Sequence, residues 1–192
     1  MVVARIPENE RERLLELYSY DILTTQYKED FDEIVELASE ICNTPISLIT
    51  LVDANKQLFK AKVGILKPDD TDRNVSFCSH AILSDNLFTV SDATQDDRFF
   101  DNPLVTEQPN IRFYAGMPLV NKNGFKLGTL CVIDTVPRDL NERQTKALKI
   151  LAKQVIKLFE LRLKNREIQA QSQILSQHKT RLEELNSIQN KI

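Results

Sequence analysis

The amino-acid sequence predicts an α+β domain, in which a five- to six-stranded antiparallel sheet is flanked by N- and C-terminal helices. Three observations predict this fold class. Apolar residues recur at helical spacing over 27–42, short β-type runs follow over 46–63 and 113–133, and a long stretch without Pro or Gly begins at residue 141. With 192 residues, the chain fits one domain and an appended segment.

Two helices are expected before the sheet. Residues 8–20 form a short charged helix, and residues 27–42 form a second one. The second helix has an apolar stripe made by Phe31, Ile34, Val35, Ala38, Ile41 and Cys42. Pro45 ends this helix, because proline cannot continue one.

Five β-type runs follow. They are Ile46–Val52, Gln57–Val63, Leu87–Ser91, Phe113–Val120 and Leu127–Ile133. The last two flank Asn123-Gly124, a pair typical of a hairpin turn. Between the second and third runs, Lys67–Asn74 reads as a polar connection, and Ser79–Leu83 reads as a short helix. Hairpin-like links between neighbouring runs favour an antiparallel sheet.

Composition and charge narrow the classes of function. The net charge is −3 and there is no basic stripe with interleaved aromatic residues, which argues against a nucleic-acid partner. No apolar run approaches the ~20 residues that span a bilayer, so no membrane span is expected. The N-terminus is charged at once and lacks the apolar core of a signal peptide, and the three cysteines are an odd number at wide spacing. A cytoplasmic, reducing location is expected.

The C-terminal helix carries a coiled-coil pattern. Asn141 and Gln144 form a capping-box pair at its start. Farther along, Leu161, Ile168, Leu175 and Leu182 recur every seven residues, with Leu185 and Ile192 at the alternate position. The same alternate position holds Lys164, Gln171 and His178, and the step from Leu158 to Leu161 comes one residue early. The coiled coil is therefore expected to be marginal.

Six segments together resemble a GAF domain of the type found at the N-terminus of bacterial sensor histidine kinases and diguanylate cyclases. They are RLLELYSYDIL (13–23), PISLITLVDANKQLFKAKVG (45–64), SFCSHAI (76–82), DATQDDRFFDNPLV (92–105), IRFYAGMPL (111–119) and LGTLCVID (127–134). The resemblance implies a PAS-related sheet ordered 2-1-5-4-3, with terminal helices on one face and a ligand pocket on the other. It also implies a homodimer through the N- and C-terminal helices and a downstream kinase or cyclase domain.

On this basis the chain divides into three parts. Residues 1–26 are an N-terminal helix and linker, residues 27–160 are the GAF sensory domain, and residues 161–192 are a coiled-coil signalling helix. The motif of cyclic-nucleotide-binding GAF domains is missing, since Phe31-Asp32-Glu33 lies on the first long helix.

Nine residues between 76 and 134 are candidates for contacting a ligand. They are Phe77, Cys78, His80, Asp92, Arg98, Phe99, Arg112, Tyr114 and Cys131. Cys78 and His80 at a helix start favour a thiolate–imidazolium pair, suited to redox sensing, a bilin thioether or a haem contact. The alternative is a packed thiol and a histidine that hydrogen-bonds the loop. Cys131, in an apolar run, also fits a small core residue.

The loop Asp92–Asn110 reads as a lid, because ordered loops of this length are uncommon and often functional. Arg98 is suited to an anionic ligand group, and Phe99 to an apolar floor; alternatively Arg98 pairs with a nearby aspartate and the phenylalanines pin the loop. Arg112 and Tyr114 share a strand face with Gly116, which favours pocket positions, the alternative being a cross-strand pair and a bulge.

We therefore expect a sensory domain of a bacterial signal-transduction protein. It binds a small molecule, or responds to a thiol signal, and transmits the change through a dimeric helix. The chain itself is expected not to be an enzyme. Two alternatives stay open: a structural dimerisation module without a ligand, and a methionine-sulfoxide reductase using Cys78, although the 92–110 loop has no second cysteine. The ligand and any cofactor are unknown from the sequence.

Overall fold

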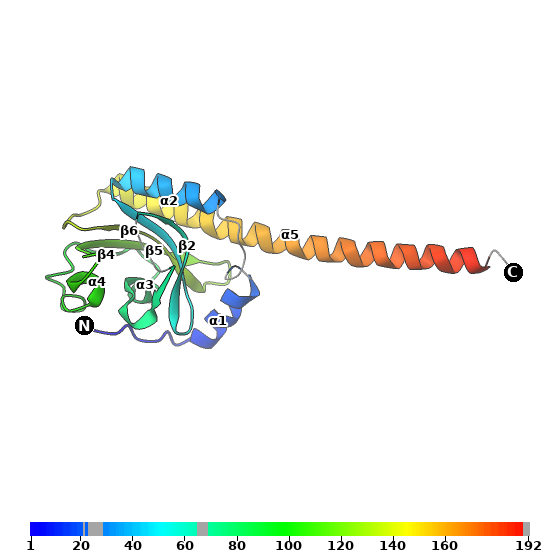
Figure 1. Ribbon diagram of the computed structural model, residues 1–192, viewed down its shortest axis with the longest axis horizontal. Coiled ribbons are helices and arrows are strands. Elements are labelled where there is room, and N and C mark those ends of the chain that lie inside the picture. Colours follow the sequence, from blue (N-terminus) through cyan, green and yellow to red (C-terminus); the bar gives the residue numbers. More distant parts are fainter. Residues whose placement is uncertain (21, 23–28, 65–68, 190–192) are drawn as a thin grey trace. The chain divides into compact units, whose positions relative to one another are not determined.

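The computed structural model describes residues 1–20, 22, 29–64 and 69–189, without the side chains of residues 29 and 187–189. The chain forms two units, Met1–Lys157 and Leu158–Ile192. The first unit holds the sheet, shown with its helices in Figure 1. The second unit belongs to the helix α5, which extends from Glu142 to Gln189.

The sheet of the first unit has six strands among the described residues, all paired antiparallel, in the order β3-β2-β1-β6-β5-β4. The strands are β1 (Ile46–Val52), β2 (Lys56–Val63), β3 (Asp70–Asp72), β4 (Phe88–Val90), β5 (Phe113–Val120) and β6 (Lys126–Asp134). Without β3, the order is that implied by the GAF resemblance. The α+β fold class is confirmed.

Strand β3 was not expected, because its segment was read as part of a polar connection. Its three residues are Asp-Thr-Asp, which carry no apolar signal. The strand forms because it pairs with β2. Thr71 lies opposite Gln57, and Lys56 forms an ion pair with Asp70 at 2.9 Å. The remainder of the predicted connection, residues 67 and 68, lies outside the described residues.

Helices cover both faces of this sheet. α2 (Glu29–Cys42) packs against β1, β2 and β6, and the first turns of α5 lie beside it (Figure 1). Phe31, Val35 and Ala38 of α2 are fully buried. Burial of the Phe31 and Val35 side chains stabilises the folded state by about 1.5–3 kcal/mol each. The predicted start of α2, residues 27 and 28, lies outside the described residues. On the opposite face lie α3 (Phe77–Ala81) and α4 (Pro103–Thr106).

α1 (Glu10–Ser19) packs where the hairpin turns meet. Its Glu16 accepts hydrogen bonds from the side chains of Asn121 and Asn123, at 2.7 and 2.9 Å, in the β5–β6 turn. Tyr18 donates to Asp53 in the β1–β2 turn at 2.6 Å. These bonds fix α1 to the two turns, so it belongs to the first compact unit.

Two local predictions are confirmed. Asn141 accepts from the backbone N–H of Gln144, whose side chain accepts in turn from the N–H of Asn141, both at 3.0 Å. Gly124 has a φ of +83°, and its N–H donates to the carbonyl of Asn121 at 3.0 Å, which closes the hairpin turn.

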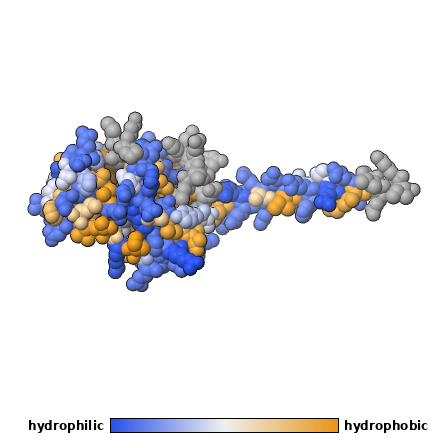
Figure 2. Space-filling view, turned by 60° about the horizontal axis from the view of Figure 1, so that its bottom comes forward, coloured by the Kyte–Doolittle hydropathy of each residue, from blue (hydrophilic) through white to orange (hydrophobic). Residues whose placement is uncertain are grey.

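The second unit is a single helix with an exposed apolar series. Leu161, Ile168, Ile174, Leu175, Leu182 and Leu185 are each more than half exposed. Orange patches mark such side chains along the blue helix in Figure 2. Four of these residues, Leu161, Ile168, Leu175 and Leu182, belong to the predicted seven-residue repeat, and a coiled coil formed by this helix stays a prediction.

Candidate ligand-binding site

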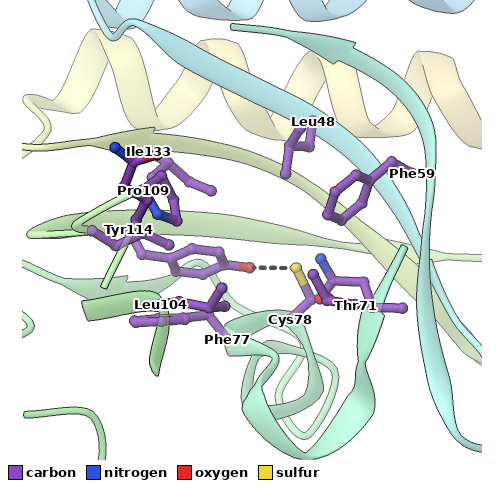
Figure 3. A pocket seen from close by; sticks show the side chains of 12 residues that line it. Leu48, Phe59, Thr71, Phe77, Cys78, Leu104, Pro109, Tyr114 and Ile133 are labelled. Carbon is purple, nitrogen blue, oxygen red and sulfur yellow. Dashed lines mark hydrogen bonds between the residues drawn. The ribbon is translucent and has the colours of Figure 1, made fainter. Parts of the chain in front are cut away.

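A cavity of about 190 Å³ lies on the face of the sheet opposite α2 (Figure 3). Its apolar walls are Leu48, Phe59, Phe77, Leu104, Pro109, Ile111 and Ile133, and its polar residues are Gln57, Thr71, Cys78, Gln108 and Tyr114. None of these twelve residues is an Asp, Glu, Lys, Arg or His. A cavity of about 150 Å³ with similar walls holds a benzene molecule, so this one accommodates a ligand of single-ring size.

Helix α3 brings Phe77 and Cys78 to the cavity. Ser76 caps the helix by accepting from the N–H of Ser79 at 3.2 Å, and its own hydroxyl donates to Gln57 on β2. Ser79 donates to the carbonyl of Arg73 at 2.9 Å. α3 therefore begins at Phe77, earlier than the predicted Ser79, because Ser76 supplies the cap.

Cys78 is the centre of a buried polar cluster. The hydroxyl of Tyr114 donates to its sulfur at 3.2 Å, and the hydroxyl of Thr129 donates at 3.1 Å. Thr129 and Thr50, neighbours on β6 and β1, share a hydrogen bond of 3.0 Å. The thiol of Cys131 also forms a hydrogen bond with the sulfur of Cys78. All five residues are at most 1 % exposed, and both thiols are free.

The pKa values of the two thiols in this cluster shift in opposite directions. Burial by itself raises the pKa of Cys78, but the donors from Cys131, Thr129, Thr50 and Tyr114 stabilise a thiolate and lower the pKa to about 6. Burial and the neighbouring Cys78 raise the pKa of Cys131 well above its ordinary value. Cys78 is thus the thiol that ionises first.

Gly116 makes room for the Tyr114 ring. A Cβ at position 116 would lie 2.2 Å from the phenol oxygen, which no side chain tolerates. The phenol therefore lies along its own strand, over the glycine, and reaches α3. This confirms that the glycine permits a close approach within the strand.

The 92–110 loop supplies the outer wall of the cavity. Its Leu104, Gln108 and Pro109 line the space. Asn102 caps α4 by accepting from the N–H of Leu104 at 2.9 Å, and its side-chain amide donates to the carbonyl of Val75 beside α3 at 3.0 Å. The loop is thus fastened to the turn just before α3 and forms one wall of the cavity.

Of the nine candidate residues, Phe77, Cys78 and Tyr114 line the cavity directly. Cys131 lies behind Cys78, in hydrogen-bond contact with it. Phe99 stacks on Phe77, with ring centroids 4.0 Å apart and 8° between the planes, so it supports the wall from behind.

Four candidates lie outside the cavity lining and make other contacts. Arg98 pairs with Asp96 at 2.6 Å and lies over the Phe88 ring, 4.9 Å from its centroid. Arg112 donates to the carbonyls of Val105 and Ile111, at 2.9 and 3.0 Å, which holds the loop. Asp92 accepts from Thr94 at 2.7 Å.

His80 is the fourth of these residues. Its Nε2 lies 3.0 Å from the carbonyl oxygen of Val2, and burial lowers its pKa. Among the described residues it makes no hydrogen bond with Cys78; its ring instead meets the Phe99 ring edge-on, with the centroids 4.8 Å apart. The predicted thiolate–imidazolium pair is replaced by the thiol–hydroxyl cluster, because residues two positions apart on a helix point to different sides of it.

Most residues of the cavity walls were not predicted from the sequence. Leu48 and Ile133 were assigned only as strand residues, although alternation along β1 and β6 places them on the face of Cys131. Gln57, Thr71 and the loop residues carried no signal, since the pairing of β3 and the course of the loop bring them to the cavity.

An antiparallel sheet with long helices on one face, and a cavity between the sheet and the short helices α3 and α4 on the other, defines a pocket-bearing α+β domain. The sequence matches the GAF domain family over residues 27–157. This is more than half of the chain, and the chain belongs to the GAF domain family.

One relative from Pseudomonas aeruginosa, named a cyclic di-GMP phosphodiesterase, is 43% identical over 157 residues. The match covers 81% of this chain and 27% of that protein, so the chain spans about a quarter of its relative's length. The expectation that the chain is not an enzyme is contradicted by this relative, whose name is that of an enzyme. The relative is named neither a histidine kinase nor a diguanylate cyclase.

Solved structures share the fold. The GAF domain of Thermosynechococcus elongatus PixJ has a TM-score of 0.57 at 16% identity, covering 91% of this chain and 98% of that one. The GAF domain region of a Geobacter sulfurreducens protein has a TM-score of 0.56 at 21% identity, covering 79% and 97%. A free methionine-R-sulfoxide reductase from Neisseria meningitidis has a TM-score of 0.57 at 18% identity, covering 78% and 87%.

In the described parts of the chain, no helix has both the length and the apolarity that crossing a membrane requires.

Proposed function

We propose that this GAF domain regulates a cyclic di-GMP phosphodiesterase by binding a small molecule in the cavity next to Cys78. The observation that carries the proposal is the cavity itself: about 190 Å³, walled by apolar side chains, in a chain 43% identical to part of a phosphodiesterase. Cyclic di-GMP, a dinucleotide with two phosphates, exceeds this space and would meet no cation there. The proposed ligand is therefore an effector and a different molecule from the substrate.

A connected set of contacts supports a route from the cavity to the C-terminal helix. Ile133 lines the cavity, and the next residue, Asp134, pairs with Arg138. Arg138 donates to the carbonyl of Asn43 at 2.6 Å, and Gln144 of α5 donates to the carbonyl of Ile41 at 3.1 Å. A ligand that moves β6 therefore acts on the ends of α2 and α5 together.

The C-terminal helix is proposed to pair with that of a second copy. Four of its exposed apolar residues, Leu161, Ile168, Leu175 and Leu182, recur every seven residues, which fits an identical partner in register, and pairing would remove these side chains from water. We keep the division into residues 1–26, 27–160 and 161–192 as part of this proposal. α1 would then join the domain through its contacts with the hairpin turns.

The two alternatives have less support. A purely structural module predicts a core packed with side chains, whereas the cavity is open space. A methionine-sulfoxide reductase acts on an amino acid, which carries two charges, and no Asp, Glu, Lys or Arg lines the cavity to pair with them. The likeness to the Neisseria enzyme, at 18% identity, concerns the fold alone.

The test is the rate of cyclic di-GMP hydrolysis by the complete protein that contains this chain. Filling the cavity by Leu104→Phe should remove the response of the rate to a small-molecule extract of the host. The matched control, Leu37→Phe, changes an exposed residue of α2 and should leave the response intact. Hydrolysis that never responds to the extract, or that responds equally in Leu104→Phe, would refute the regulatory role.

A further inference from the structure

The cavity offers its ligand an apolar wall and one unused hydroxyl. Thr71 on β3 lines the cavity, and its Oγ1 is buried without a hydrogen-bond partner among the described residues. A buried hydroxyl without a partner is uncommon in a native protein and calls for an explanation. A ligand group that both donates and accepts would supply the missing bond.

Three of the four other polar side chains of the lining already take part in hydrogen bonds. Tyr114 donates to Cys78, which also accepts from Thr129 behind it, and the side-chain oxygen of Gln57 accepts from Ser76. Gln108 is exposed at the outer wall. Thr71 is therefore the lining residue whose polar atom most needs a partner.

The side chains around Thr71 indicate the chemical class of the remaining part of the ligand. Three aromatic rings border the cavity: Phe59, Phe77 and Tyr114. Aromatic side chains pack favourably against another ring, edge-on or offset. The volume of about 190 Å³ matches one ring. No Asp, Glu, Lys, Arg or His lines the cavity, and the Cys78 thiolate is already stabilised by its own donors, so a charged ligand group would be costly there.

We infer that the cavity binds a neutral, single-ring aromatic molecule carrying one hydroxyl group, with that hydroxyl bonded to Thr71. The inference rests on the proposed function, since it names the effector class of the same site. It assigns Thr71 as a specificity-determining residue, and Leu104 as the residue whose size limits the ligand.

Three single-ring probes test this inference: phenol, benzene and benzoate, titrated against the 192-residue chain by ligand-observed NMR. Phenol should bind about three- to tenfold more tightly than benzene, the advantage of one hydrogen bond. Benzoate should bind at least about tenfold more weakly than phenol, because its charge has no partner. Thr71→Val should abolish the advantage of phenol over benzene.

Two controls complete the design. Thr89→Val makes the same change at an exposed position of β4 and should keep the preference for phenol. Leu104→Phe should remove the binding of all three probes, and its thermal unfolding reports whether it still folds. Equal affinities for phenol and benzene in the unchanged chain, or benzoate binding as tightly as phenol, would overturn the inference.

The two proposals fail separately. If no neutral ring binds but the host extract still regulates hydrolysis through Leu104, the ligand class is wrong and the regulatory role stands. If phenol binds as described but hydrolysis never responds to phenol or to the extract, the ligand class stands and the regulatory role is wrong.

Discussion

The hydroxyl of Tyr114 on β5 donates to the sulfur of Cys78 on α3 at 3.2 Å. The bond joins the sheet to the helix that covers it, and both residues are 1 % exposed. It requires Gly116, because any side chain there would occupy the place of the phenol. The chemistry of the thiol therefore depends on packing two residues farther along the strand.

Gly116→Ala should destabilise the domain by about 1–3 kcal/mol, because the new Cβ forces the Tyr114 ring away. Urea unfolding measures the change in the free energy of unfolding. The same substitution in a Tyr114→Leu background should cost much less, since the colliding atoms are gone. Equal costs in the two backgrounds would contradict the steric explanation.

Tyr114→Phe should raise the pKa of Cys78 above its value of about 6, because one of the donors that stabilise the thiolate is lost. The ultraviolet absorbance of the thiolate, followed against pH, measures this shift. Thr129→Val removes another donor and should shift the pKa in the same direction. Thr89→Val, at an exposed position, is the control that should leave the titration unchanged.

The free energy of unfolding should decrease at acid pH, and Glu10 should contribute to this decrease. Burial raises its pKa, but hydrogen bonds with Arg13, at 2.7 and 2.8 Å, and an ion pair with Arg73 outweigh this effect and lower it. A lowered carboxylate pKa contributes stability that is fully present above the unfolded pKa, near 4.5, and is lost as the pH falls through the folded value.

Glu10→Gln should therefore cost about 2 kcal/mol at neutral pH, and the difference from the unchanged chain should shrink below pH ~4.5. Chemical unfolding at a series of pH values gives this difference. Glu12→Gln, an exposed neighbour on α1, is the matched control and should have little effect. A difference that is constant from neutral to acid pH would rule out the linkage.

Leu175→Lys should weaken self-association of the chain by about tenfold or more, because a charge would enter the apolar seam of the proposed coiled coil. Sedimentation equilibrium measures the association constant. Gln173→Lys adds the same charge on the outer face and should leave association nearly unchanged. A monomeric unchanged chain at all concentrations would refute the proposed dimer.

Much of the fold follows from local sequence. β1 was predicted with its observed bounds because a seven-residue run, of which six residues are apolar or β-branched, lies between a proline and an aspartate turn. Asn123-Gly124 predicted the hairpin, because glycine adopts the positive φ that the turn requires. Asp-Thr-Asp gave no such signal, so β3 became visible only through its pairing with β2.

The candidate site was predicted in part. Cys78 and Tyr114 were named from a helix start and a strand face, and both line the cavity. Arg98 and His80 were suited by type to a ligand, but their partners decide their use: Asp96 pairs with the guanidinium, and the carbonyl of Val2 meets the imidazole. Residue type fixes what a side chain can bind, whereas its neighbours fix what it does bind.

The sequence by itself determined five of the strands and the long helices, because these depend on periodicity and on turn residues close in the chain, and its six motif segments carried the resemblance to the GAF family. Only the tertiary structure decided which thiol ionises first and where the cavity lies. Those properties arise from Thr71, Tyr114, Thr129 and Cys131 meeting around Cys78 and the space beside it. Contacts between residues so distant along the chain leave no local pattern to be read.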